Sequence, residues 1–251
     1  MGKYSGILLC SDLDGTLYNG TEIPEANIKA IKYFRENGGL FTVASGRQSK
    51  FVMDLFENYD FGVPLINVNG AIIYDINQGK KIKNTYMSGL TKELFYRIFE
   101  EIPEIINANF FQRDEIIKIY NKNRVDITDK CCEDIYKVTF AIERNKEISD
   151  RSIAVLRSIV GDTFVLTRSS WGCMELLDPR NTKEKATRYL ADLVGAEQLV
   201  CVGDFENDIG MVRDADIGYA VANAIDELKA VADRITVSVN DGAIAQIIEE
   251  L

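Results

Sequence analysis

Two aspartates, Asp12 and Asp14, stand two residues apart after the apolar run Ile7–Cys10. Such a run, closed by Gly15, predicts a buried strand of a parallel sheet, with both carboxylates at its carboxyl end. Ligands of open α/β sheets bind at this edge. Neighbouring anions repel each other and are costly to desolvate unless a cation or a proton-transfer role compensates. The pair therefore predicts a site for metal-assisted or acid–base chemistry, where Thr16 offers a hydroxyl and an amide to an anion.

More polar side chains are expected at the same edge, because they follow two further predicted strands or begin a helix. These residues are Ser45, Lys183, Asp204, Asn207 and Asp208. Four carboxylates in one crevice, without a thiolate cluster, are typical of a site for a hard cation, and Mg²⁺ prefers such oxygen ligands. We expect Asp12 and Asp204 to bind the ion directly with the backbone carbonyl of Asp14, while Asn207 and Asp208 hold waters or orient neighbours.

The composition limits the possible functions. The chain has 251 residues, of which 46% are hydrophobic and 27% charged, as in soluble proteins with one large domain or two smaller ones. A net charge of −10 argues against a nucleic-acid partner, which would require basic patches. Because histidine is absent, acid–base catalysis must use Asp, Glu, Lys, Tyr or Cys.

The five cysteines predict a reduced protein. Cys10 and Cys201 lie in apolar runs, where buried inert thiols are expected. The adjacent Cys131 and Cys132 could form a metal or redox pair, but no second pair completes such a site. We find no signal peptide and no apolar run of membrane length, and we therefore expect a cytoplasmic protein without a membrane partner.

Strands and helices alternate in the first and last parts of the chain, which predicts an α/β fold with a parallel sheet. Strands are expected at 7–11, 40–44, 65–68, 71–74, 199–202, 217–221 and 235–237. Helices are expected at 24–37, 48–56, 183–194, 207–212, 224–232 and 243–251. The first helix should bury Ile28, Ile31 and Phe34. The helix after Lys183 should bury Ala186, Tyr189, Leu190, Leu193 and Val194.

The middle of the chain, residues 85–177, has a different character and predicts an inserted α+β unit. We expect helices around 94–102 and 149–160, the latter capped by Ser149. Strands are expected at 105–111 and 115–120, joined across Gln112-Arg113-Asp114, and also at 136–142, 163–167 and 173–177. The strand at 136–142 alternates in polarity, which predicts one solvent-exposed face.

The ordered motifs resemble those of the haloacid dehalogenase superfamily. They are Asp12-Leu13-Asp14-Gly15-Thr16, then Ser45, then Lys183, and then Gly203-Asp204-Phe205-Glu206-Asn207-Asp208. The insert resembles the type IIB cap of the Cof-like sugar-phosphatase branch by position and length. Asn69-Gly70-Ala71, Asn223-Ala224 and Asn240-Asp241-Gly242 are similar to that branch too. The resemblance implies a Rossmann-like core, residues 1–84 and 178–251, with an inserted α+β cap at 85–177.

The resemblance also implies a Mg²⁺-dependent phosphatase that acts on a small phosphorylated metabolite, with a sugar phosphate as the expected substrate. Asp12 would attack phosphorus and form an aspartyl-phosphate, and Asp14 would act as general acid and base. The implied metal set is Asp12, Asp14, Asp204 and Asp208. The implied substrate-binding set is Ser45, Gly46, Arg47, Lys183 and Asn207, of which Ser45 and Lys183 would also assist catalysis. The cap would close over the substrate, and Arg113, Arg168 and Trp171 are candidates for selective contacts.

Two other functions fit the same residues. A phosphosugar mutase with the same core would pass the phosphoryl group to another hydroxyl instead of to water. A non-catalytic protein would bind a phosphorylated ligand, although such a protein has little need of a nucleophile at Asp12. The sequence is compatible with a monomer or a small homo-oligomer.

Overall fold

The computed structural model describes residues 2–56, 61–113 and 115–251, which form two compact units. One unit comprises the chain up to Asn84 together with Thr182–Leu251, and the other comprises Thr85–Asn181. The inserted unit extends past Leu177, where its end was expected. Its two ends are joined because the Asn181 side chain donates a hydrogen bond to the Thr85 carbonyl over 3.0 Å.

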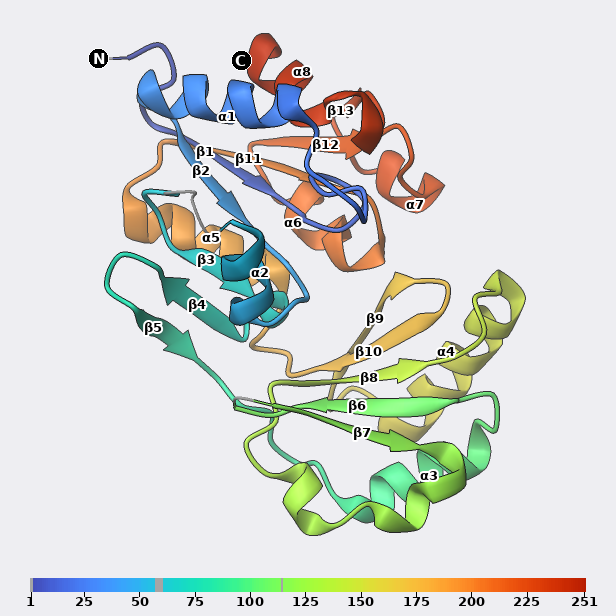
Figure 1. The fold of residues 1–251 in the computed structure, drawn as a ribbon. Coiled ribbons are helices and arrows are strands. Elements are labelled where there is room, and N and C mark those ends of the chain that lie inside the picture. The colour runs from blue at the N-terminus through green and yellow to red at the C-terminus, as the bar shows by residue number, and fades with distance from the viewer. Residues whose placement is uncertain (1, 57–60, 114) are drawn as a thin grey trace. The chain divides into compact units, whose positions relative to one another are not determined.

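The first unit is built around a parallel sheet, as its continuous apolar runs predict (Figure 1). The strand order is β13-β12-β11-β1-β2, and each neighbouring pair is parallel. The strands are β1 (Ile7–Ser11), β2 (Leu40–Val43), β11 (Gln198–Gly203), β12 (Ile217–Val221) and β13 (Arg234–Thr236). Their carboxyl ends consequently meet at one edge, which is where ligands bind in such sheets.

Helices cover both faces of this sheet. Helices α1 and α8 contact each other on one face, and α5 and α6 contact each other on the other (Figure 1). The α-helices of this unit are α1 (Glu25–Glu36), α2 (Ser49–Leu55), α5 (Lys183–Val194), α6 (Ile209–Arg213), α7 (Asp226–Lys229) and α8 (Ala243–Glu250). This arrangement confirms the predicted Rossmann-like α/β core.

The buried faces of two helices differ from the prediction. In α1, Ile28 is 39% exposed, and Asn27 is buried instead because its Oδ1 accepts a hydrogen bond from the Ala245 amide over 3.0 Å. In α5, Tyr189 and Leu193 are 46% and 48% exposed. The buried residues of α5 are Lys183, Ala186, Thr187, Leu190 and Ala191. The buried face of α5 is therefore not the predicted apolar stripe but one that contains a charged residue, Lys183, and a polar residue, Thr187.

A second, antiparallel sheet follows in the same unit. Its strands are β3 (Leu65–Asn67), β4 (Ile72–Asp75) and β5 (Lys80–Asn84), in the order β3-β4-β5. A parallel bridge between Ala44 and Ile66 places β3 beside the end of β2. The chain turns between β3 and β4 at Val68–Gly70. The sequence predicted the turn from Asn-Gly, whereas β5 was not predicted because its lysines conceal the strand pattern.

The second unit has an antiparallel sheet of five strands, with the order β7-β6-β8-β10-β9. The strands are β6 (Asn107–Phe111), β7 (Ile116–Tyr120), β8 (Lys137–Ala141), β9 (Val165–Ser170) and β10 (Cys173–Leu177). Its α-helices, α3 (Lys92–Glu101) and α4 (Lys146–Val160), pack on an apolar core with the sheet (Figure 1). The predicted α+β layer is confirmed. Asp114, expected in the β6–β7 turn, lies outside the described residues.

Two local predictions in this unit are wrong. Helix α4 is capped by Asn145, whose side chain accepts a hydrogen bond from the Ile148 amide over 3.0 Å, while Ser149 lies buried within the helix. The expected solvent-exposed face of β8 is buried, since Lys137 and Thr139 are only 2% and 5% exposed. Lys137 forms an ion pair with Glu175 there, over 3.1 Å.

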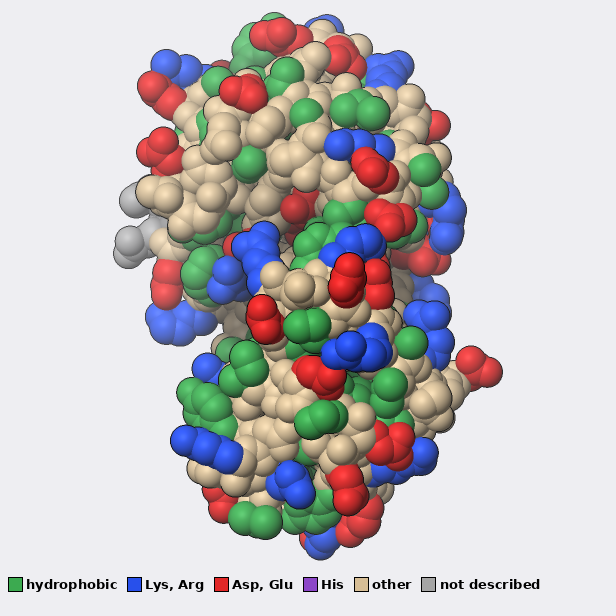
Figure 2. All heavy atoms as spheres, turned by 90° about the vertical axis from the view of Figure 1, so that its right-hand side faces the viewer, with side chains coloured by type: hydrophobic (Ala, Val, Ile, Leu, Met, Phe, Trp, Pro, Cys, Tyr) green, Lys and Arg blue, Asp and Glu red, His purple; other side chains and the backbone are tan. Residues whose placement is uncertain are grey.

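Short 3-10 turns complete the described secondary structure. They are Val68–Gly70, Asn121–Asp126, Asp129–Cys132, Glu206–Asp208 and Val239–Asp241. All five cysteines are free thiols. Among the described residues, none of the helices has the length and apolar character required to cross a bilayer. Acidic and basic side chains are interspersed over the face in Figure 2 rather than gathered by sign.

Candidate active site

Three aspartates from two neighbouring strands converge at the carboxyl edge of the parallel sheet. Asp12 follows β1, Asp204 follows β11, and Asp208 ends the short turn after it. One carboxylate oxygen of each lies within 4.8 Å of the other two. Asp12 is 5% exposed and Asp208 is fully buried. The cluster is therefore a compact set of hard oxygen donors in a largely desolvated corner.

The backbone of the first motif brings Asp12 and Asp204 together. β1 and β11 are adjacent, and the Asp12 amide donates to the Val202 carbonyl over 2.9 Å. The loop after Asp12 turns at Gly15, which has φ of +90°. A Cβ at Gly15 would lie 2.3 Å from Oδ2 of Asp204, so only glycine fits there.

Lys183 connects two of the aspartates. Its Nζ donates to Oδ1 of Asp12 over 2.5 Å and to Oδ1 of Asp208 over 2.7 Å, and its side chain is completely buried. Lys183 begins α5, where the helix dipole disfavours a cation. Burial alone lowers the pKa of Lys183, but Asp12 and Asp208 outweigh it and raise that pKa, so the ammonium stays charged.

The carboxylates of the corner outnumber the cationic groups that the described residues place against them. Three carboxylates against one ammonium leave two negative charges when all are ionised. Burial, with Asp208 close by, raises the pKa of Asp12 to about 7, and burial with Asp12 raises that of Asp204 to about 9. A divalent cation would supply the missing positive charge, and three carboxylates are donors that Mg²⁺ accepts, so the residues fit such an ion.

The Asp14 side chain lies outside this cluster and pairs with Arg47. Arg47 donates from Nε to Oδ2 of Asp14 over 3.0 Å and from Nη2 to Oδ1 over 2.9 Å. Both side chains are half exposed, and the guanidinium also lies 4.5 Å from the centre of the Phe51 ring. The sequence predicted both residues at the site but did not predict this bidentate contact.

Ser45 and Thr16 bring hydroxyl groups to the same strand ends. Ser45 is 1% exposed, and its Oγ accepts a hydrogen bond from the Arg47 amide over 3.0 Å, with Gly46 between them. Thr16 is completely buried, and its Oγ1 has no hydrogen-bond partner among the described residues. Asn207 is half-buried in the turn that ends at Asp208.

Asn223 is a site residue that residue-by-residue reasoning missed. Its Nδ2 donates to the Gly15 carbonyl over 2.8 Å, and its Oδ1 accepts from the Val239 amide over 2.9 Å. The side chain therefore holds the loop that carries Asp14 against the loop after β13. The available signal was the similarity of Asn223-Ala224 to the Cof-like branch.

The candidate selective residues of the second unit are bound within that unit. Arg113 pairs with Asp134 over 2.8 Å. Arg168 pairs with Asp150 over 2.5 Å and lies 4.7 Å from the centre of the Trp171 ring. These contacts give the three residues structural roles, and their predicted contacts with substrate stay a prediction.

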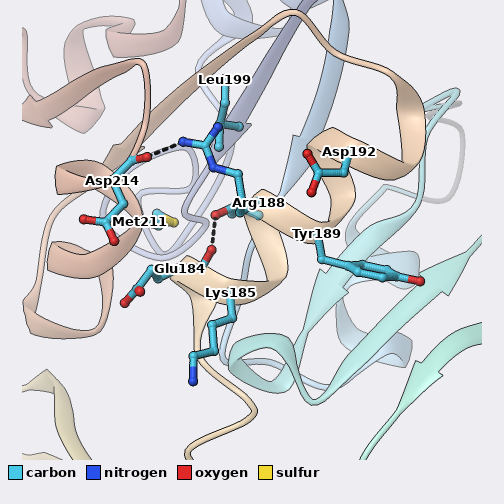
Figure 3. Close-up of a pocket in the computed structure, with 9 residues that line it drawn as sticks. Glu184, Lys185, Arg188, Tyr189, Asp192, Leu199, Met211 and Asp214 are labelled. Atoms are coloured by element: carbon cyan, nitrogen blue, oxygen red, sulfur yellow. Dashed lines mark hydrogen bonds between the residues drawn. The ribbon is translucent and has the colours of Figure 1, made fainter.

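A separate pocket of about 360 Å³ lies along the outer side of α5 (Figure 3). Its lining residues are Glu184, Lys185, Thr187, Arg188, Tyr189, Asp192, Leu199, Met211 and Asp214. Arg188 crosses this pocket and donates a hydrogen bond to the Asp214 carbonyl (Figure 3). As far as the described residues show, the lining includes none of the predicted site residues.

Comparisons with known proteins agree with this geometry. A family model described as haloacid dehalogenase-like hydrolase matches residues 9–248. A 5-amino-6-(5-phospho-D-ribitylamino)uracil phosphatase of Bacillus subtilis is 23% identical, over 97% of this chain and 96% of its own. A phosphoglycolate phosphatase of Sulfurisphaera tokodaii is 28% identical, over 94% and 89%.

The fold is also shared with solved structures. A subclass IIB sugar phosphatase of the haloacid dehalogenase superfamily superposes with a TM-score of 0.82 at 18% identity, covering 97% of this chain and 98% of its own. The family match extends over nearly the whole chain and includes both halves of the core. The chain belongs to the haloacid dehalogenase-like hydrolase family.

Proposed function

We propose that this chain hydrolyses a phosphate monoester of a small metabolite, with sugar phosphates as the substrate class, in a Mg²⁺-dependent reaction. The observation that carries the proposal is the cluster of Asp12, Asp204 and Asp208, with Lys183 bonded to two of them. Such a corner combines a nucleophile with the positive charge that a phosphoryl group requires. The names of the two relatives above, which both specify phosphorylated small molecules, support this substrate class.

Asp12 and Asp204 are the proposed Mg²⁺ ligands, together with the Asp14 backbone carbonyl, and Asp208 belongs to the same set. When bound, the ion offsets the negative charge of the corner and polarises a phosphoryl oxygen. Asp208 also has a positioning role, because its Oδ2 accepts hydrogen bonds from the amides of Asp204 and Phe205 over 3.1 and 3.3 Å.

Asp12 is the proposed nucleophile. Its carboxylate oxygen forms a bond to phosphorus as the bond to the leaving oxygen breaks, which gives an aspartyl-phosphate. The hydrogen bond from Lys183 favours the ionised carboxylate and fixes its direction. Lys183 has three N–H donors, so it can bind Asp12, Asp208 and a phosphoryl oxygen together. Ser45 and the Gly46 amide are proposed to bind the other phosphoryl oxygens, with Asn207 beside them.

Asp14 is the proposed general acid and base. It donates a proton to the leaving alkoxide, and then accepts one from the water that attacks the aspartyl-phosphate and releases inorganic phosphate. Its side chain stands apart from the three clustered aspartates and pairs with Arg47, so in this proposal a separate carboxyl group serves the leaving oxygen. Hydrolysis restores both aspartates for the next cycle.

A phosphate-release assay over a panel of sugar phosphates tests this proposal. We expect release that requires Mg²⁺ and is lost with a chelator and in Asp12→Asn. Asp54→Asn is the matched control, because Asp54 is an exposed carboxylate paired with Lys50 on α2. Activity that survives chelation or Asp12→Asn contradicts the proposal. An isomerised sugar phosphate without free phosphate indicates a mutase, and binding without turnover indicates a ligand-binding protein.

A further inference from the structure

The turn between β3 and β4 has an unusual backbone conformation. Val68, Asn69 and Gly70 are consecutive and have φ of +51°, +54° and +92°. Side chains disfavour this left-handed region, and a β-branched valine is especially rare there. All three residues are buried. Strain of this kind persists only where the surrounding structure imposes it, and it concentrates at functional sites.

One side of the turn is bonded to the Ser45 loop. The Val68 amide donates to the Arg47 carbonyl over 3.0 Å, and the Asn69 amide donates to the Ser45 carbonyl over 3.0 Å. The Ser45 amide also donates to the carbonyl of Ile66 in β3 over 2.9 Å. The positive φ values aim two successive amides at this loop, so the loop depends on the turn for its position.

The other side of the turn packs against the start of α5. A Cβ at Gly70 would lie 2.7 Å from the Thr182 carbonyl and 2.7 Å from the Ala186 Cβ. Thr182 is the N-cap of α5 and Lys183 is its first residue. Glycine at this position therefore allows the closest approach of the turn to the helix end that carries Lys183.

We propose that the turn Val68–Gly70 is a positioning element that sets the spacing between Ser45 and Lys183. This inference rests on the proposed function, in which Ser45 and Lys183 hold the transferred phosphoryl group. The contacts of the turn run to the Ser45 loop and to α5, whereas the clustered aspartates follow β1 and β11. A displaced turn should therefore weaken phosphoryl binding more than Mg²⁺ binding, which Lys183 affects through its hydrogen bonds to Asp12 and Asp208.

Gly70→Ala tests this inference, with Gly79→Ala as the matched control. Gly79 also has positive φ, +62°, but no atom of the described residues lies within 4 Å of its added Cβ. The probe is inorganic phosphate, measured by direct binding in the presence of Mg²⁺ and as an inhibitor. In Gly70→Ala we expect phosphate affinity to fall at least about tenfold and kcat/KM on the order of 100-fold, because misplacing a binding group by about 1 Å has this effect.

The Mg²⁺ concentration that gives half-maximal activity should change less than the phosphate affinity, because the turn bonds to the Ser45 loop and packs on α5, whereas Asp12 and Asp204 follow β1 and β11. If Gly70→Ala does not fold, Ala186→Ser adds one atom to the same contact from α5 and should show a smaller loss of phosphate affinity. Equal losses of phosphate and Mg²⁺ affinity, or no loss relative to Gly79→Ala, overturn the inference. If the wild type neither binds nor releases phosphate, the proposed function itself fails.

Discussion

Replacing Lys183 by methionine tests the electrostatics of the corner most severely. The wild-type ammonium is completely buried and donates to Asp12 and Asp208 over 2.5 and 2.7 Å. Methionine retains much of the side-chain volume but leaves two buried carboxylates without their cation. The main loss is therefore the charge and its hydrogen bonds.

The expected loss in the free energy of unfolding follows from the two broken ion pairs. Removing one partner of a buried pair costs about 3–5 kcal/mol, because the remaining charge stays desolvated. For a protein of this size that loss lowers the melting temperature by roughly 6–20 °C. The pKa of Lys183 is raised in the folded state, so its contribution is fully present below the unfolded-state value of about 10.4 and is lost only as pH rises through the folded value. The loss should consequently be visible at pH 8.

Circular dichroism during urea unfolding measures the change in free energy. The only tryptophan, Trp171, lies in the other unit, so its fluorescence reports that unit separately. Lys185→Met is the matched control, because Lys185 is exposed on the same helix and its change should stay within about 0.5 kcal/mol. A loss below about 1 kcal/mol in Lys183→Met, or an equal loss in the control, refutes the assignment of a buried bridging lysine.

Three further predictions concern other contacts. Arg47→Ala should slow hydrolysis of alkyl phosphates about tenfold more than that of aryl phosphates in steady-state assays. The variant removes the contact that orients Asp14, and only an alkoxide leaving group needs the proton that Asp14 donates. Equal slowing of both substrates contradicts this. Mg²⁺ affinity, measured by calorimetry, should rise from about pH 6 to about pH 9. The pKa of Asp12 is raised to about 7 and that of Asp204 to about 9, so at lower pH the ion must displace protons from both carboxyl groups. An affinity that does not change with pH argues against these ligands. Asn27→Ala should lower the free energy of unfolding by about 1–3 kcal/mol in urea titrations, because it leaves the partly buried amide of Ala245, in the first turn of α8, without its acceptor. An unchanged midpoint contradicts this.

The convergence of the aspartates was predictable because it follows from topology. Apolar runs end two residues before Asp12 and Asp204, and adjacent parallel strands deliver their carboxyl ends to one edge. The role of Lys183 as a bridge was not predictable from its helical position, where the dipole disfavours it. Its two partners depend on side-chain directions that only the packed structure determines.

The errors have physical causes that the residues illustrate. The buried stripe of α5 contains Lys183 and Thr187, so a search for apolar residues selected the exposed Tyr189 and Leu193 instead. Likewise, Asn-Gly predicted a turn after β3, but nothing about valine predicts positive φ at Val68. Polar groups that face inward, and backbone strain that tertiary contacts impose, are invisible to periodicity.

The central claim is that Asp12 accepts the phosphoryl group. Asp14→Asn should arrest the cycle after this step with an aryl phosphate, whose leaving group needs no proton, because the base for the attacking water is missing. Acid quenching, proteolysis and mass spectrometry should then find one phosphoryl group on Asp12, and none when a chelator is present. Release of the aryl alcohol with Asp12 unmodified would contradict the account.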